Sequence, residues 1–161
     1  MTKPKSSVMV AVAAIIENPD GDILLIKRSS DNEEYPNYWE DVGGRLEQSE
    51  SPEDGLKREI SEETGITDIE IIKPLTMFHV YRKEIKKAEN ELIGISYWCR
   101  TNCKEVTLSH EHSDYKWVSP TEAFELTEHP ALKSYIQIYL DEKNLHKKVQ
   151  FLYDWKERFK S

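Results

Sequence analysis

The stretch from Gly44 to Ile66 constrains this chain most, because helix-boundary signals enclose a dense run of charge there. Ser51 and Pro52 are typical of a helix N-cap and of the first residue inside a helix. Gly65 is typical of the left-handed residue that ends a helix. We therefore predict a single helix between these signals, with four ionisable side chains in the six positions at its centre.

Three of these side chains are glutamates that share one face of the predicted helix. A helix advances about 100° per residue, so Glu59, Glu62 and Glu63 fall within an arc of roughly 100°. Like charges three or four positions apart repel one another unless a cation lies among them. Carboxylates on one rigid face suit Mg²⁺ or Mn²⁺, which leave positions for water and substrate phosphates. A Glu-rich helix alone is usually a solvated face, so the rest of the stretch decides between these interpretations.

The rest of the stretch favours the metal site. The fixed positions of a longer pattern are all filled, at Gly44, Glu50, Arg58, Glu59, Ile60, Glu62, Glu63, Gly65 and Ile66. This pattern resembles the full signature of the Nudix hydrolases. The resemblance implies an α/β fold, an α/β/α sandwich with a mixed β-sheet, in one domain over residues 1–161. Residues from about 141 to 161 exceed what the simplest Nudix domain needs, and we expect a helical C-terminal extension there.

The resemblance also implies a reaction, the hydrolysis of a diphosphate that joins a nucleoside to another group. It implies that Mg²⁺, or alternatively Mn²⁺, is held by Glu59, Glu62, Glu63 and the backbone carbonyl of Gly44 and bridges phosphate oxygens. Water polarised by the metal and deprotonated by a carboxylate then attacks one phosphorus in line. Nucleoside triphosphates, cleaved as by MutT-type members, are the preferred expectation for the substrate.

Arg58 is expected to orient the carboxylates rather than to bind substrate. From the carboxylate flank its guanidinium can hold a carboxylate in a bidentate pair, and Glu50 is a suitable partner. Asp54 lies one turn earlier, so an ordinary helix pair between positions i and i+4 is the structural alternative. The two interpretations predict different hydrogen-bond partners for Arg58.

A further acidic residue is predicted near the metal from the spacing of a late strand. The segment around Trp117 resembles a late Nudix strand, and in MutT-type members an acidic residue six positions before this tryptophan reaches the metal site. Here that position is Glu111, and His112 and Asp114 are the fallback candidates. Either Glu111 or Glu59 is then the general base, and the sequence leaves this choice open.

Four residues outside the helix are predicted to contact substrate. Lys27 and Arg28 come at the end of a predicted strand, where they would meet phosphates, although exposed strand ends often carry such residues. Gly43 has the backbone freedom that lets a phosphate approach closely. Tyr35 lies in a polar loop, where its ring would stack on a base.

Periodicity and turn signals predict the elements around the helix. Composition rich in β-formers indicates strands at Val8–Ile16, Ile23–Lys27, Ile69–Arg82 and Glu91–Arg100. A capping box predicts a short helix after Ser119. Apolar spacing predicts a helix over Pro130–Leu140 and then a second amphipathic segment, with Leu145, Val149, Leu152 and Trp155. Packing or the formation of a homodimer is the expected use of this last segment.

Composition limits the expected partners and location. The net charge is −8, with 30 acidic against 22 basic residues, so binding to a nucleic-acid polymer is not expected. No stretch approaches the ~20 apolar residues of a membrane-spanning helix, so no membrane partner is expected. Cys99 and Cys103 are interpreted as reduced thiols of a cytoplasmic protein. The expected partner is a nucleotide or another small molecule linked to a nucleoside diphosphate.

Three other functions stay open. The nearest is the same chemistry on ADP-ribose or a dinucleotide. Isopentenyl-diphosphate isomerase shares the fold, but the cysteine expected before its Gly-Gly pair is absent from the segment Tyr38 to Val42. A catalytically silent Nudix domain that senses a nucleotide typically lacks one or more of the signature glutamates, and this chain keeps all of them.

Overall fold

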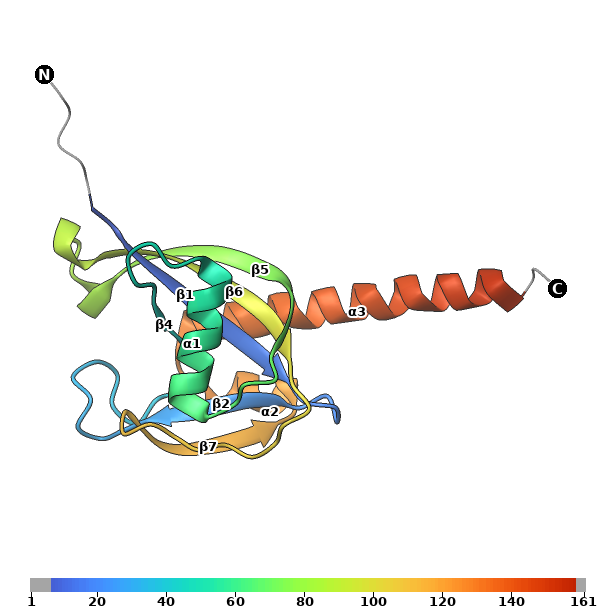
Figure 1. The fold of residues 1–161 in the computed structure, drawn as a ribbon, viewed down its shortest axis with the longest axis horizontal. Coiled ribbons are helices and arrows are strands. Elements are labelled where there is room, and N and C mark those ends of the chain that lie inside the picture. The colour runs from blue at the N-terminus through green and yellow to red at the C-terminus, as the bar shows by residue number, and fades with distance from the viewer. Residues whose placement is uncertain (1–6, 159–161) are drawn as a thin grey trace, which may run out of the picture.

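The computed structural model describes the backbone of residues 7–158 and the side chains of residues 7–151 (Figure 1). The strands in this part of the chain are β1 Met9–Glu17, β2 Ile23–Arg28, β3 Trp39–Glu40, β4 Val42–Arg45, β5 Glu70–Tyr81, β6 Glu91–Arg100 and β7 His112–Val118. The α-helices are α1 Pro52–Thr64, α2 Pro120–Leu126 and α3 Pro130–Arg158. Two short 3₁₀ turns lie between β5 and β6, at Arg82–Glu84 and Ala88–Asn90.

The strands form one mixed sheet that opens beside its central strand. The main order is β3-β2-β1-β6-β5, while β4 pairs with β1 and β7 pairs with β2. β1 and β6 run parallel, and the other pairs are antiparallel. β1 meets β2 through Glu17 and Ile23, and it then pairs with β4 along Ala11–Ala14. The segment from β3 to β4 therefore crosses from β2 to β1 where those two strands part.

Helices cover both faces of this sheet (Figure 1). On one face, Leu56 and Ile60 of α1 pack into a core formed with β1, β2 and β6. On the other face, Ile136 and Tyr139 of α3 pack into a second core. β1 contributes to both cores, which is why Ala11–Ile16 is an unbroken buried apolar run. This arrangement confirms the predicted α/β/α sandwich.

The boundaries of α1 follow the predicted signals. The hydroxyl of Ser51 accepts a hydrogen bond from the N–H of Asp54 at 3.2 Å, and Pro52 is the first helical residue. Gly65 has a φ of 72°, and its N–H donates to the carbonyl of Ser61 at 3.0 Å. These caps satisfy backbone groups that a helix end leaves unpaired. They fix where the carboxylate face begins and ends.

The C-terminal extension is part of one continuous helix. α3 runs for 29 residues, so the two predicted helical segments are joined, and its distal part projects beyond the sheet (Figure 1). Leu145 and Val149 are 58% and 43% exposed, so they do not pack into either core. The side chains of Leu152 and Trp155 lie outside the described residues. The predicted helical extension is confirmed, and a homodimer through this segment stays a prediction.

Two further sequence expectations concern cysteines and membranes. Cys99 is buried and Cys103 is partly exposed, and both are free thiols. Burial raises the pKa of the Cys99 thiol to about 12, so it stays protonated at neutral pH. Across the described residues, no helix combines the length and the apolar character needed to cross a membrane.

Candidate active site

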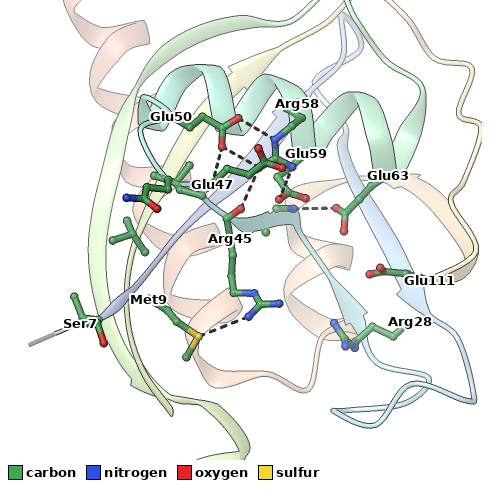
Figure 2. A pocket seen from close by; sticks show the side chains of 16 residues that line it. Ser7, Met9, Arg28, Arg45, Glu47, Glu50, Arg58, Glu59, Glu63 and Glu111 are labelled. Carbon is green, nitrogen blue, oxygen red and sulfur yellow. Dashed lines mark hydrogen bonds and ion pairs between the residues drawn. The ribbon is translucent and has the colours of Figure 1, made fainter. Parts of the chain in front are cut away.

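A cleft of about 980 Å³ opens between the carboxylate face of α1 and strand β4 (Figure 2). It exists because β4 pairs with β1 and so brings the two neighbouring glycines beside α1. Most of the predicted site residues line this cleft, namely Arg28, Gly43, Gly44, Arg58, Glu59, Glu63 and Glu111. The fold thus gathers side chains from β2, β4, α1 and the turn before β7.

Arg58 holds Glu50 in a bidentate ion pair (Figure 2). Its Nε donates to Oε1 of Glu50 and its Nη2 donates to Oε2, each at 2.9 Å. Two parallel bonds of this kind are the strongest geometry that a guanidinium offers a carboxylate. They lower the pKa of Glu50 to about 2. Asp54, the alternative partner, instead accepts from the hydroxyl of Ser51 at 2.7 Å.

The same guanidinium holds two glutamates of the carboxylate face. Its Nη1 donates to Oε1 of Glu59 at 2.9 Å and to Oε2 of Glu62 at 3.1 Å. Its Nη2 also donates to the carbonyl oxygen of Arg45, at 3.1 Å. Arg58 therefore joins α1 to the end of β4 and offsets the repulsion expected among the glutamates. Its partners include Glu50 and not Asp54, and the orienting role of Arg58 stays a prediction.

Glu59 lies directly against the backbone of β4. A Cβ at Gly44 would lie 2.3 Å from Cδ of Glu59, so only glycine leaves room for the carboxylate there. Burial raises the pKa of Glu59, and the charge of Arg58 opposes this effect. The nearby charges of Glu62 and Glu111 raise the pKa further. The close approach explains why the glycine and the glutamate occur at this spacing.

Glu63 is more enclosed than the neighbouring helix carboxylate. Its side chain is 12% exposed, against 59% for Glu62. Its Oε2 accepts a hydrogen bond from the N–H of Gly43 at 3.1 Å. Burial raises the pKa of Glu63 to about 9, and nearby carboxylates add to this rise although the Gly43 bond opposes it. The metal-free protein therefore holds a proton on Glu63 at neutral pH.

The turn before β7 brings Glu111 to the same cleft. The N–H and the hydroxyl of Ser29 donate to the carbonyl oxygen of Glu111 at 2.9 and 2.7 Å, which fixes the turn. In the view of Figure 2, Glu111 lies between Glu63 and Arg28. The fallback candidates are placed differently, since His112 is buried and Asp114 lies exposed on β7, outside the cleft lining.

Glu40 contacts Arg28 at the edge of the cleft and lines the aromatic pocket, and the sequence did not single it out. Its carboxylate accepts from Nη1 of Arg28 at 3.0 and 3.1 Å, and its Oε1 lies 3.0 Å from Nε2 of His112. Its charge also contributes to the raised pKa of Glu63. Its place between Trp39 and the glycine pair was the only local signal. The contact itself arises from the pairing of β3 with β2, which the sequence does not display.

Lys27 and Tyr35, two of the predicted substrate contacts, lie away from this cleft. Lys27 and Arg28 are neighbours on β2, so their side chains point to opposite faces of the sheet. The Nζ of Lys27 lies 5.7 Å from the ring centroid of Trp39, which packs against the core on the α3 side. Tyr35 lines a separate aromatic pocket together with Tyr38.

The cleft has the donor set of a divalent-metal site. Among the described residues no ready-made cluster of three metal-binding side chains occurs, and Arg58 and the Gly43 N–H each hold a carboxylate oxygen. Nevertheless Glu59, Glu63 and Glu111 bring hard oxygen ligands to one cleft. Burial and mutual repulsion disfavour the ionised forms of Glu59 and Glu63, and a divalent cation would relieve both effects. The residues present therefore fit Mg²⁺ or Mn²⁺.

Known proteins resemble this chain over most of its length. The chain matches the NUDIX domain over residues 8–138. The chain belongs to the Nudix family. It is accordingly a Nudix hydrolase, and enzymes of this family generally need a divalent metal ion.

Among curated relatives, this Nudix hydrolase is similar to nucleoside triphosphatase NudI of Escherichia fergusonii. The two are 35% identical over 114 residues, which cover 68% of this chain and 80% of the relative. NudI of Escherichia coli strain K12 is 34% identical over 117 residues, with the same coverage.

Solved structures of other Nudix proteins share the fold. The MutT protein from Methanosarcina mazei Go1 is 28% identical, covers 88% of this chain and 99% of its own, and has a TM-score of 0.66. An Ap4A hydrolase from C. elegans is 20% identical, covers 85% of this chain and 98% of its own, and has a TM-score of 0.71. At that identity the second likeness concerns the fold alone.

The orienting position of Arg58 predicts a specific kinetic effect. Arg58→Lys is expected to lower kcat by about 10- to 100-fold with little change in KM, because a single ammonium cannot hold Glu50, Glu59 and Glu62 together. Initial rates and a melting temperature measure the effect. Lys57→Arg, at the exposed neighbouring position, is the matched control and should change neither. A large rise in KM with kcat intact would instead place Arg58 on the substrate.

The raised pKa of Glu63 predicts how pH affects the metal-free protein. The carboxyl ionises near 4.5 when unfolded and near 9 when folded, so the folded state binds more protons between these values. Glu63 therefore makes the free energy of unfolding fall as pH rises through that window. Denaturation with a chelator present, in wild type and Glu63→Gln, measures this contribution. The variant should lose stability less steeply with rising pH, and equal slopes would contradict the assignment.

Proposed function

We propose that this Nudix hydrolase cleaves nucleoside triphosphates to a nucleoside monophosphate and pyrophosphate, with Mg²⁺ as its metal. The observation that carries the proposal is the junction of two cavities. The cleft and a neighbouring polar pocket of about 530 Å³ share Arg28, Arg45 and Glu111. Carboxylates suited to a metal therefore adjoin guanidinium groups suited to phosphates. The 35% identity to a nucleoside triphosphatase supports the same substrate class.

Arg45 is the better placed of the two shared arginines to bind a phosphate. It is exposed, and its Nη1 makes a weak contact of 3.8 Å with Sδ of Met9. Arg28 is more fully engaged, since it pairs with Glu40 and its Nε donates to the carbonyl of Glu34 at 2.7 Å. We infer that Arg45 contacts the phosphates directly, while Arg28 mainly holds Glu40 and contributes its positive charge.

The carboxylates of the cleft would bind the metal and act as the general base. Glu59, Glu62 and Glu63, with the carbonyl of Gly44, would hold the metal, which lowers the pKa of water from 15.7 towards ~7 and offsets phosphate charge. Glu111 lines the same cleft from a different element and accepts the proton of the attacking water. Glu59 is the less suitable base because the guanidinium of Arg58 already occupies one of its oxygens.

A nucleotide, or a small molecule linked to a nucleoside diphosphate, occupies the two joined cavities. We place the enzyme in the cytoplasm, where its proposed substrates are made and consumed. A silent sensor is disfavoured because all the signature glutamates are kept and three of them, Glu50, Glu59 and Glu63, line the cleft.

A substrate screen tests the proposed reaction. Ribo- and deoxynucleoside triphosphates, ADP-ribose and dinucleoside polyphosphates are incubated with the protein and Mg²⁺, and a matched reaction contains a chelator. Pyrophosphate and the monophosphate are expected from triphosphates, with no release in the chelator. Cleavage confined to ADP-ribose or dinucleotides would replace the substrate assignment. Cleavage of none of them would favour the sensor.

The role of Glu111 yields a separate prediction. Glu111→Gln should lower kcat by about 10²-fold or more, with KM nearly unchanged, because proton transfer from water is lost. Asp114→Asn removes a carboxylate from an exposed position on β7 and should leave kcat unchanged. Steady-state rates at saturating Mg²⁺ compare the two. A loss confined to KM would make Glu111 a binding residue, and no loss would move the base to Glu59.

A further inference from the structure

We propose that Asp41 selects the base of the nucleotide by accepting a hydrogen bond from an N–H group on the base, inside an aromatic pocket on the α3 side of the sheet. This inference rests on the proposed function and deepens it, because it names a residue that distinguishes one substrate from another. Asp41 stands between β3 and β4, outside the signature that defines the metal site.

The pocket has the size and lining of a site for a flat ring. Its volume is about 590 Å³, within the range of small-molecule sites. Tyr35 and Tyr38 lie on one part of its wall, with ring centroids 5.4 Å apart. Phe78 and Tyr135 lie on another part, also with centroids 5.4 Å apart. Aromatic rings of this kind stack on any nucleobase, because every base has a flat π-face.

Asp41 supplies the polar group that such a pocket needs for selection. Its Oδ2 is buried and has no hydrogen-bond partner among the described residues. The next residue, Val42, packs into the core on the α1 side, whereas Asp41 lines the aromatic pocket. An enclosed oxygen without a donor costs free energy, and burial raises the pKa of Asp41 to about 7. A ligand donor would remove this cost once rotation of the carboxyl brings the oxygen to the pocket surface.

The pocket also continues the path that the phosphates are proposed to follow. The polar pocket next to the metal cleft is lined by Glu34 and Arg82, and the same two residues line the aromatic pocket. Arg82 forms an ion pair with Glu34, so this pair stands at the boundary of the two cavities. A nucleotide with its phosphates near Arg45 can therefore direct its base towards Asp41.

The chemistry of Asp41 sets what the base must present. A carboxylate oxygen accepts hydrogen bonds, so it favours a ring edge that carries an imino or amino N–H. Uracil and guanine offer ring N–H groups, and cytosine and adenine offer amino groups. Methylation of that nitrogen removes the donor and adds bulk in the same place. The inference therefore predicts discrimination at a single atom of the base.

Matched nucleotides and a matched variant test this. Each triphosphate that the wild type hydrolyses is compared with its analogue lacking the donor: N3-methyl for uracil, N1-methyl for guanine, and dimethylamino for cytosine or adenine. Methylation should lower kcat/KM by about 10- to 100-fold in the wild type. In Asp41→Leu the kcat/KM for the unmodified nucleotide should fall by a similar factor. Methylation should then lower kcat/KM by less than about threefold. Asp114→Leu, on exposed β7, should behave as the wild type.

Other results would overturn the inference. The first is that methylation lowers kcat/KM by the same factor in Asp41→Leu as in the wild type. The second is that Asp41→Leu hydrolyses the unmodified nucleotide with an unchanged kcat/KM. Asp41→Asn keeps an acceptor at this place and serves if Asp41→Leu does not fold. It should retain more activity on the unmodified nucleotide than on its methylated analogue, and loss of that preference contradicts the acceptor role.

Failure of the proposed function is recognised separately. If no nucleotide is hydrolysed, binding of the four nucleoside 5′-monophosphates is measured by calorimetry. If the wild type binds a monophosphate and Asp41→Leu does not, the role of Asp41 in base recognition is supported although no nucleotide is hydrolysed. Equal binding by both proteins, or binding by neither, overturns it.

Discussion

The active-site geometry of this Nudix hydrolase depends on the guanidinium of Arg58. It makes five hydrogen bonds, as many as it has N–H groups, to three carboxylates and one backbone carbonyl. Without it, Glu59 and Glu62 would repel one another on one helix face. With it, these side chains and the end of β4 form one hydrogen-bonded unit. The cation therefore sets the geometry in which the carboxylates can meet a metal.

A short segment of chain then distributes side chains between two cavities. Because β1 leaves β2 and pairs with β4, residues 39–45 cross between the two strands. Along this segment Gly43 and Gly44 line the metal cleft, while Trp39 and Asp41 line the aromatic pocket. The proposed metal site and the proposed base-selecting residue thus lie on one short segment. The opening in the sheet would let a single nucleotide reach both.

Local signals in the sequence were sufficient to predict the helix that carries the carboxylates and most of the residues that line the cleft. The caps at Ser51 and Gly65 depend on nearby residues only, and they fixed α1 and so its glutamates. The spacing between Glu111 and Trp117, read through the family resemblance, placed the former in the cleft. In contrast, Glu40 and Arg45 are placed by the pairing of their strands with β2 and β1. Local sequence signals do not reveal this pairing, so neither residue was predicted at the site.

Other differences have equally local physical reasons. Lys27 and Arg28 were expected together at the phosphates, although neighbours on a strand point to opposite faces, and Lys27 lies against Trp39. Two helical segments were expected at the C-terminus, and α3 joins them because no glycine or proline interrupts the chain between residues 131 and 158. Asp41 gave no signal because the pocket around it is formed by residues from distant parts of the chain.

Anomalous diffraction from crystals grown with Mn²⁺ would show whether Arg58 and the β4 glycines hold a carboxylate site for a divalent ion. We expect a manganese peak within coordination distance of carboxylate oxygens of Glu59 and Glu63, weakened or absent in Arg58→Lys. A peak bound elsewhere in the protein at saturating Mn²⁺, or no peak, would show that these residues do not form the metal site.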